Sequence, residues 1–308
     1  MIKKILFYTL IIGAFSLIIF SIVTDPNTFY TNIINSLSVW LYNVYPALFT
    51  FYIISSCLIN FNIIKKISFV VKPFIRFSSQ KSYELFITSI FVGNPSSTSL
   101  IMNELDNETI PMEDANKLLK VCSFFNPLYI IAIVSGSYLF SIKYAFIIMI
   151  SILLANLLVG LFIKSKRNSI SNKPIFNHQI KLDVIFNAIN QAMSILLLVA
   201  GIMVFANILK FSFLSFLKYF NIEGNLINIF ASLFEISTGL VDLFTVNPPL
   251  IILMSLASAM FAFQGFSVNM QVLNIINDRK IKFLPIFLTR FFQGIVAGCI
   301  TFIILNII

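Results

Sequence analysis

Long apolar runs, separated by short polar stretches, make up almost the whole chain of 308 residues. A helix needs about 20 consecutive apolar residues to cross the hydrocarbon core of a bilayer. Runs of this length predict an all-α polytopic membrane protein. The apolar segments lie at 5–23, 44–62, 84–104, 121–139, 144–163, 183–209, 226–247, 250–268 and 284–306.

Two of these segments are poor candidates for a simple crossing. Segment 84–104 is interrupted at residues 93–99 by a run of small, polar and helix-breaking residues. Segment 226–247 carries two carboxylates, one of them Glu235, and a carboxylate at the centre of a lipid-facing helix costs at least about 2.5 kcal/mol. Each segment either crosses the membrane or enters it as a re-entrant hairpin and returns on the same side.

The composition agrees with a membrane protein. Hydrophobic residues make up 58% of the chain and charged residues only 11%, whereas soluble domains carry about 25% charged residues. The net charge of +9 does not indicate a nucleic-acid partner, because Lys and Arg lie between the apolar segments, as in cytoplasmic loops. We therefore expect the lipid bilayer, and no nucleic acid, among the partners.

The positions of Lys and Arg favour two re-entrant hairpins. With a cytoplasmic N-terminus and both poor segments re-entrant, 17 basic residues lie inside and 3 outside. If both segments cross, the numbers become 13 and 7. Since basic residues are enriched in cytoplasmic loops, we predict seven crossings and two hairpins that enter from opposite faces. The basic groups assigned to the inside are 3–4, 65–81, 117–120, 164–181 and 279–282.

Opposed hairpins are typical of the inverted repeats of secondary transporters, whose substrate site lies between the halves. In each half of this sequence a long apolar segment precedes the hairpin and a broken segment follows it. The predicted organisation is an N-terminal anchor (1–30), a first repeat (31–163) with hairpin 84–104, a basic cytoplasmic linker (164–182), and a second repeat (183–308) with hairpin 226–247.

The first hairpin carries a candidate anion-binding turn. Asn94 is suited to cap a short helix with Pro95 at its first position. The free N–H groups of the next residues would then face the cavity at the positive end of the helix dipole, an arrangement that suits a carboxylate or phosphate. The alternative is a surface loop with a good helix cap. The substrate-binding candidates are Gly93, Asn94, Pro95, Ser96, Ser97 and Thr98.

The second hairpin carries a buried carboxylate beside hydroxyl groups. Such a group can bind Na⁺, carry a proton, or hold a polar part of a substrate. The alternative is a structural ion pair between Glu235 and Arg290. The candidates are Glu235, Ser237, Thr238 and Gly239.

The broken segments that follow the hairpins supply the sides of the predicted pocket. Asn126 and Pro127 interrupt the first, and Gln264 and Ser267 lie in the second. Polar residues of this kind also act as hydrogen-bonding glue between helices, which is the alternative. Stretch 103–120 reads as a solvated acidic loop and helix in the cytoplasm.

No motif for catalysis or a resident metal is found. The single histidine and the three separate cysteines do not form a ligand cluster, and no nucleophile has a plausible base. We expect no enzyme activity, no catalytic residue, no metal site and no cofactor, apart from a coupling ion, Na⁺ or H⁺, at Glu235.

Four motifs in order resemble the YlbJ-type sporulation integral membrane proteins of the nucleoside-recognition (Gate) group, which is related to concentrative nucleoside transporters. The resemblance runs from about Trp40 to Gln293. The motifs are Gly93-Asn94-Pro95-Ser96, Asn126-Pro127-Leu128-Tyr129-Ile130, Glu235-Ile236-Ser237-Thr238-Gly239, and residues 263–271 (FQGFSVNMQ).

The resemblance implies a multi-pass transporter in the bacterial cytoplasmic membrane, active in sporulation. Its cargo would be a small polar, anionic metabolite similar to dipicolinate or a nucleoside. The alternative is a membrane scaffold of the same fold that transports nothing. A homo-oligomer is compatible with either function.

Cysteine labelling tests the predicted re-entrance. In a variant without native cysteines, Ser97→Cys should react with a membrane-impermeant thiol reagent from the cytoplasmic face, because the first hairpin enters from that side. A cysteine at Lys117 should react from the same face. Labelling of both positions only from outside would overturn the topology.

Overall fold

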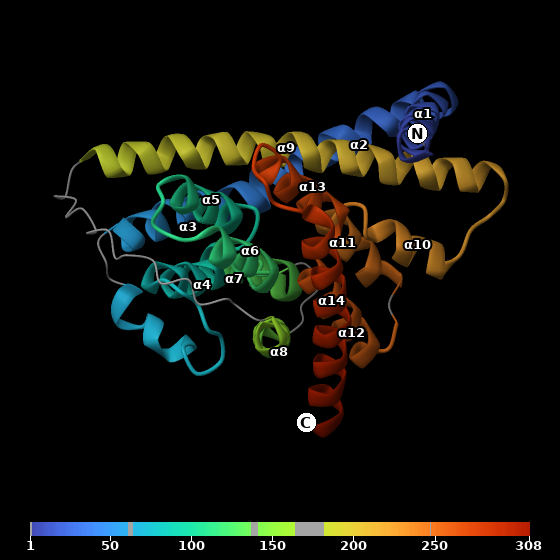
Figure 1. Cartoon of the computed structure of the whole chain (residues 1–308). Helices are drawn as coiled ribbons and strands as arrows, with labels where there is room; N and C mark the ends of the chain where they lie inside the picture. Colours follow the sequence, from blue (N-terminus) through green and yellow to red (C-terminus); the bar gives the residue numbers. More distant parts are fainter. Residues whose placement is uncertain (1, 61–63, 137–140, 164–181, 247) are drawn as a thin grey trace.

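The computed structural model describes residues 2–60, 64–136, 141–163, 182–246 and 248–308, and these parts of the chain are built from helices, turns and short irregular links without a β-strand (Figure 1). The first half holds α1 (Ile2–Thr24), α2 (Pro26–Val39), α3 (Tyr45–Asn60), α4 (Gln80–Val92), α5 (Ser96–Asp106), α6 (Met112–Val121), α7 (Pro127–Ile131) and α8 (Ile142–Phe162). The second half holds α9 (Leu182–Tyr219), α10 (Asn225–Ser232), α11 (Ile236–Val246), α12 (Leu250–Phe263), α13 (Gly265–Ile276) and α14 (Phe283–Ile307).

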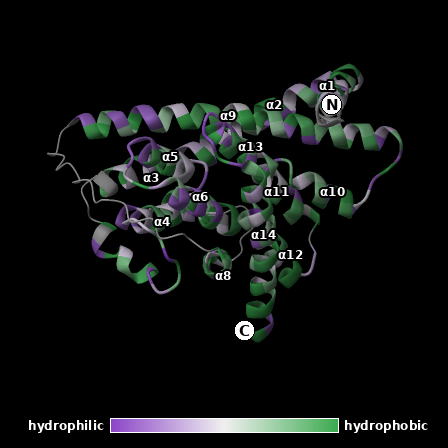
Figure 2. Ribbon diagram, in the orientation of Figure 1, coloured by the Kyte–Doolittle hydropathy of each residue, from purple (hydrophilic) through white to green (hydrophobic). Residues whose placement is uncertain are grey.

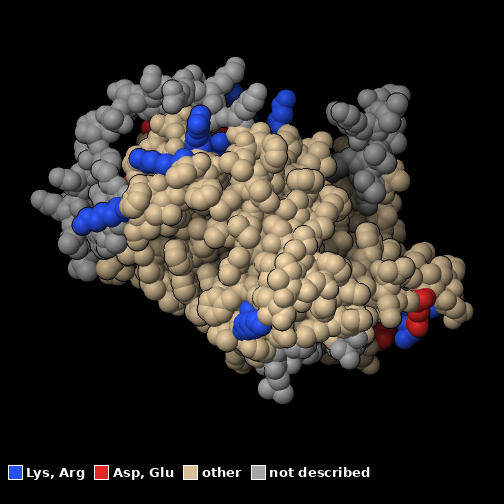
Figure 3. All heavy atoms as spheres, turned by 90° about the horizontal axis from the view of Figure 1, so that it is seen from below, with Lys and Arg blue, Asp and Glu red and all other residues tan. Residues whose placement is uncertain are grey.

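Five helical stretches in the described chain are long and apolar enough to cross a membrane. Apolar residues cover most of these helices (Figure 2), and a broad face of the molecule carries few charged side chains (Figure 3). An all-helical membrane protein is therefore confirmed, while the seven crossings stay a prediction. The five stretches are Pro26–Leu58, Ile142–Phe162, Asp183–Tyr219, Leu250–Ile276 and Phe283–Ile307.

The two halves contain similar elements in the same order. A long helical stretch comes first: α2 and α3, joined by a π-helical turn, in one half and α9 in the other. Two short helices follow, α4 and α5 or α10 and α11, and the chain breaks between them where the hairpin tips were predicted. A broken stretch and an unbroken helix complete each half: α6 and α7 then α8, and α12 and α13 then α14. The insertion of the short pairs into a membrane stays a prediction.

The long helices of the two halves lie side by side (Figure 1). Helix α9 has 38 residues, which correspond to about 57 Å at 1.5 Å per residue. It therefore extends well past the predicted segment 183–209. Polar contacts join the two elements: Asn207 Nδ2 donates to Ser36 Oγ at 2.5 Å, and Trp40 Nε1 donates to the carbonyl of Leu196 at 3.2 Å.

The last helices pack closely because two glycines of α14 face α12. A Cβ atom on Gly294 would lie 2.9 Å from the carbonyl oxygen of Ala259, and one on Gly298 would lie 3.1 Å from that of Ser255. Small residues at a helix interface allow such close backbone approach in membranes. Helix α8 also packs against α14, so these three helices connect the halves.

The prediction of a solvated acidic face at 103–120 is wrong for Asp114. This side chain is fully buried and accepts hydrogen bonds from the backbone N–H groups of Ser78 and Ser79 and from the hydroxyl of Ser82. Because these donors lie at the start of α4, the carboxylate fixes the entry to the first hairpin. Asp106, at the far end of α5, is exposed as predicted and forms a two-fold ion pair with Arg279, which precedes α14.

The predicted linker 164–182 lies outside the described residues, apart from Leu182 at the start of α9. Its basic residues are therefore not placed relative to the helices.

We expect Gly239→Ala to destabilise the protein by about 1–3 kcal/mol, as overpacking of a well-packed core does. A Cβ atom at Gly239 in α11 would lie 2.1 Å from the carbonyl oxygen of Ser232 in α10, so the second hairpin must open. The matched control is Gly201→Ala in α9, where a Cβ atom meets nothing within 4 Å. Thermal unfolding in detergent should separate the two variants, and equal stabilities would contradict the close packing.

Candidate functional site

The first tip (residues 93–95, between α4 and α5) lies directly on the first break (residues 122–126, between α6 and α7). Gly93 has a φ of +70°, and a Cβ atom there would lie 2.4 Å from the backbone nitrogen of Asn126. The backbone N–H of Asn94 donates to the carbonyl of Phe124 at 2.9 Å. Only glycine fits this contact, because any side chain would enter the backbone of the break.

Asn94 organises this tip in a way that differs from the prediction. Its Oδ1 accepts hydrogen bonds from the hydroxyls of Ser97 at 2.8 Å and Thr98 at 2.7 Å, rather than capping backbone N–H groups. The backbone N–H of Ser97 donates to the carbonyl of Gly93 at 2.8 Å. In this conformation the Ser97 N–H is therefore not free to bind an anion, contrary to the expectation.

The predicted pairing of an asparagine cap with a following proline is found instead at the first break. Oδ1 of Asn126 accepts from the backbone N–H groups of Leu128 and Tyr129, and Pro127 takes the first position of α7. The same side chain donates from Nδ2 to the carbonyl of Phe91 at 3.2 Å. Asn126 thus starts α7 and also binds the end of α4.

The second tip (residues 233–235, between α10 and α11) places the carboxylate of Glu235 at the start of α11. Its oxygens accept from the backbone N–H groups of Ser237 at 3.1 Å and Thr238 at 2.7 Å. The side chain is buried, with the residue 2% exposed. The alternative ion pair with Arg290 is not formed: Arg290 is buried elsewhere and donates to Asn269 Oδ1 at 3.2 Å.

The second break, at Gln264 between α12 and α13, holds this tip through the backbone. Gln264 has a φ of +72°, which turns the chain sharply. The N–H of Phe266 donates to the carbonyl of Leu233 at 2.7 Å, and the N–H of Ser267 donates to that of Phe234 at 3.0 Å. Each tip therefore lies on the break of its own half.

One amide pair joins the two halves at their centre. Nδ2 of Asn94 donates to Oε1 of Gln264 at 3.1 Å and also to the carbonyl of Cys122 at 2.8 Å. Nε2 of Gln264 donates to the carbonyl of Phe124 at 2.9 Å. Gln264 thus belongs to the second break but completes the hydrogen bonding of the first tip and the first break.

A small central cavity, about 30 Å³ in volume, lies between the two tips, the first break, α13 and the long helices. A volume near 30 Å³ has room for about one or two water molecules, so an organic solute does not fit in this conformation. Six predicted site residues line it: Asn94, Pro95, Asn126, Glu235, Ser237 and Ser267. The other predicted residues support the lining without facing the cavity: Gly93, Ser96, Ser97, Thr98, Pro127, Thr238, Gly239 and Gln264.

Two polar residues of the lining, Tyr129 and Gln271, were missed as site residues. Helical spacing offered a signal for both, because Gln271 lies four positions after Ser267 in α13 and Tyr129 lies three after Asn126. Residues three or four apart share a helix face, so they should have been grouped with the predicted neighbours.

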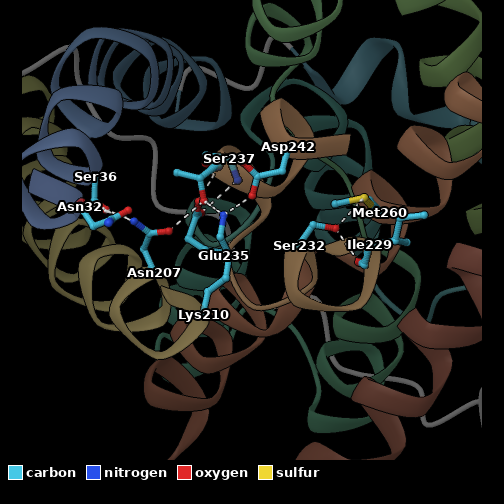
Figure 4. Close-up of polar contacts among 11 residues, drawn as sticks. Asn32, Ser36, Asn207, Lys210, Ile229, Ser232, Glu235, Ser237, Asp242 and Met260 are labelled. Atoms are coloured by element: carbon cyan, nitrogen blue, oxygen red, sulfur yellow. Dashed lines mark hydrogen bonds and ion pairs between the residues drawn. The ribbon is translucent and has the colours of Figure 1, made fainter. Parts of the chain in front are cut away.

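Lys210 is one of the three basic residues that the charge count assigned to the outer side; the structure buries its side chain, and its side of the membrane stays a prediction. Lys210 lies in α9, and its ammonium group contacts Asp242 Oδ2 at 2.5 Å and Thr238 Oγ1 at 2.8 Å (Figure 4). Thr238 Oγ1 in turn donates to Asn207 Oδ1 at 3.0 Å. This network fastens α11 to α9 beside Glu235.

The comparison with curated proteins confirms the resemblance predicted from the motifs. The chain is 23% identical over 330 residues to the sporulation integral membrane protein YlbJ of Bacillus subtilis (strain 168), and the match covers 94% of this chain and 81% of that protein. No family model matches the chain. No solved structure matches it. Together with the long apolar helices, the similarity identifies an integral membrane protein.

A double-mutant cycle on Asn94 and Gln264 should show coupling of about 1 kcal/mol or more, because residues in one hydrogen-bond network interact by about 0.5–3 kcal/mol. Asn94→Ala alone should cost about 1–3 kcal/mol, since it leaves buried partners unsatisfied. Unfolding of the purified protein is the measurement. Asn116→Ala is the control, because among the described residues Asn116 donates to the carbonyl of Met112, one turn earlier in its own helix, and to no group of the tips or breaks. Additive effects at 94 and 264 would contradict the bond between the halves.

Proposed function

We propose that this integral membrane protein is a secondary transporter in the bacterial cytoplasmic membrane for a small polar metabolite, either an anion similar to dipicolinate or a nucleoside. The observation that carries the proposal is one central cavity lined by residues of both hairpin tips, of the first break and of α13. Interrupted helices whose ends meet at the centre of the fold are typical of transporter substrate sites.

The hydrogen bonding of the tips and breaks supports this function. Irregular backbone at membrane depth is tolerated only inside protein or along a wet cavity. A static scaffold has no need for four such interruptions at one point, since continuous helices satisfy their own backbone. The residues proposed to meet the substrate are the cavity lining, Asn94, Pro95, Asn126, Glu235, Ser237 and Ser267, with the supporting residues of the tips behind them.

The small volume of the cavity implies movement during transport. With a volume of about 30 Å³, it has to widen before an organic anion can enter. We propose that one half rocks against the other and separates the Asn94–Gln264 contact. In this mechanism the two hairpins are re-entrant and the chain crosses the membrane seven times with its N-terminus in the cytoplasm.

A buried guanidinium group supports the proposal of an anionic cargo. Arg290 is fully buried, and in the described chain its Nε and Nη2 have no hydrogen-bond partner. An ionised group removed from water costs several kcal/mol unless it is paired. A guanidinium in this state attracts a carboxylate or phosphate once the halves separate.

The similarity to YlbJ supports a role in sporulation, because that relative is named as a sporulation integral membrane protein. We propose no catalytic activity and no cofactor, and we assign a coupling ion, Na⁺ or H⁺, to Glu235. The second candidate is a membrane scaffold of the same fold, which the small volume of the cavity favours. A homo-oligomer is compatible with both functions.

Transport into proteoliposomes tests the proposal. The reconstituted protein should move radiolabelled dipicolinate or uridine faster than empty vesicles. Glu235→Gln should reduce the rate at least about tenfold, equivalent to 1.4 kcal/mol, because the cavity loses its carboxylate. Asn94→Ala should do the same, because the first tip loses its side-chain hydrogen bonds.

Asn116→Ala, outside the tips and breaks, is the matched control and should keep the normal rate. If neither solute moves while a specific protein partner is retained by the intact protein, the scaffold is the better explanation. Full rates in both site variants would remove the assigned residues from the mechanism.

A further inference from the structure

We infer that the central cavity binds a sodium-sized monovalent cation, held by Glu235 together with Tyr129, Ser267 and Gln271, and that this cation fastens the two halves in the closed conformation. The choice of site rests on the proposed function, which assigned either Na⁺ or H⁺ to Glu235. The ligand groups and the closing effect follow from the geometry of the cavity.

The first step is the charge of Glu235. Its carboxylate is buried, and no ion pair to it is found among the described residues; the basic groups Lys81, Lys210 and Arg279 pair with other carboxylates. The N-terminus of α11 supplies two N–H groups and the equivalent of about +0.5 charge, which offsets the carboxylate only in part. A positive ion beside Glu235 therefore stabilises the fold.

The second step is the presence of unused oxygen atoms in the same cavity. Ser267 and Gln271 are buried with Glu235 around it, and in the described chain Ser267 Oγ and Gln271 Oε1 have no hydrogen-bond partner. The hydroxyl of Tyr129 also lines the cavity and lies near Ser237 without a well-aligned hydrogen bond. Buried polar atoms in native proteins nearly always have partners, so these three oxygens and the carboxylate converge on a ligand.

The third step is the kind of ligand. Every converging atom is an oxygen, which hard cations prefer over nitrogen or sulfur. One carboxylate balances one positive charge, and no group of three or more His, Cys, Asp or Glu suited to a metal occurs in the described residues. The volume of about 30 Å³ suits a small dehydrated ion. A monovalent ion of the size of Na⁺ fits these conditions better than a divalent ion.

The fourth step is the position of the ligands in the two halves. Tyr129 belongs to α7 in the first half, and its ring stacks on Phe125 and meets Phe261 edge-on, so its hydroxyl is held in place. Glu235, Ser267 and Gln271 belong to the second half. A cation bound by both sets joins the halves at their centre. Since a ligand stabilises the state that binds it, Na⁺ favours the closed conformation.

Thermal unfolding of the purified protein in detergent tests the site without any transport. At constant ionic strength, NaCl should raise Tm over choline chloride by at least about 3 °C once Na⁺ is well above its Kd, because binding stabilises only the folded state. KCl should give a smaller shift. Direct binding of ²²Na⁺ to the same sample should saturate near one ion per chain.

The variants locate the ion. Glu235→Gln and Gln271→Leu should each abolish ²²Na⁺ binding and the difference between NaCl and choline chloride. Gln293→Leu is the matched control, because Gln293 is another buried glutamine whose Oε1 has no partner in the described chain but which does not line the cavity. It should keep both responses. If Gln271→Leu does not fold, Ser267→Ala replaces it, with binding expected to weaken at least about tenfold.

The outcomes separate this inference from the proposed function. Equal Tm values in NaCl and choline chloride with no ²²Na⁺ binding would mean that the cavity holds only water or a proton, and would overturn the cation site whatever the transport result. Na⁺ binding that survives Glu235→Gln would also overturn it. Na⁺ binding in a protein that moves no solute would retain the site and reject the transporter.

Discussion

Backbone hydrogen bonding in a place without water is the constraint on which the rest of this structure depends. Four helix interruptions meet at the buried centre, and each leaves N–H and C=O groups that need partners within the protein. The chain resolves this by placing each tip against a break, with Asn94 bonded to Phe124 in one half and Phe266 bonded to Leu233 in the other. Each tip thus depends on its break for partners to its buried backbone groups. The hairpins and the broken helices therefore form one unit.

Within that unit the halves have different chemistry at equivalent places. The first tip is organised by an amide, Asn94, which donates and accepts at once. The second is organised by a carboxylate, Glu235, which only accepts. An amide at the first tip can reach across to Gln264, whereas the carboxylate adds negative charge to the cavity. The first tip thus joins the halves, and the second supplies the electrostatics of the site.

Much of this arrangement could be predicted from the sequence because helix breakers are local signals. Gly93 and Pro95 mark the first tip, Pro127 marks the first break, and Glu235 marks the second tip in an otherwise apolar segment. Contacts between residues that are far apart in the sequence could not be predicted from these local signals. From the sequence, Lys210 was expected to lie in a loop on the outer side. Its contact with Asp242, 32 positions later, could not be predicted. Asp114 was expected to be solvated, because its hydrogen bonds to the start of α4 connect residues more than 30 positions apart. The free N–H groups expected after Asn94 depended on a cap geometry that the hydroxyls of Ser97 and Thr98 replace.

The ion pair between Asp106 and Arg279 has a consequence for how the molecule opens. It connects the end of α5 in the first half to the turn before α14 in the second, and hydrogen bonding to Asp106 raises the pKa of Arg279, so Arg279 stays charged. It lies at the surface, with the Asp106 side chain 52% exposed, and dissolved salt screens exposed charges. The ionic strength of the solution on that side therefore adjusts how firmly the halves are held together there. A cell that concentrates salts as it loses water would weaken the Asp106–Arg279 ion pair without altering any group in the central cavity.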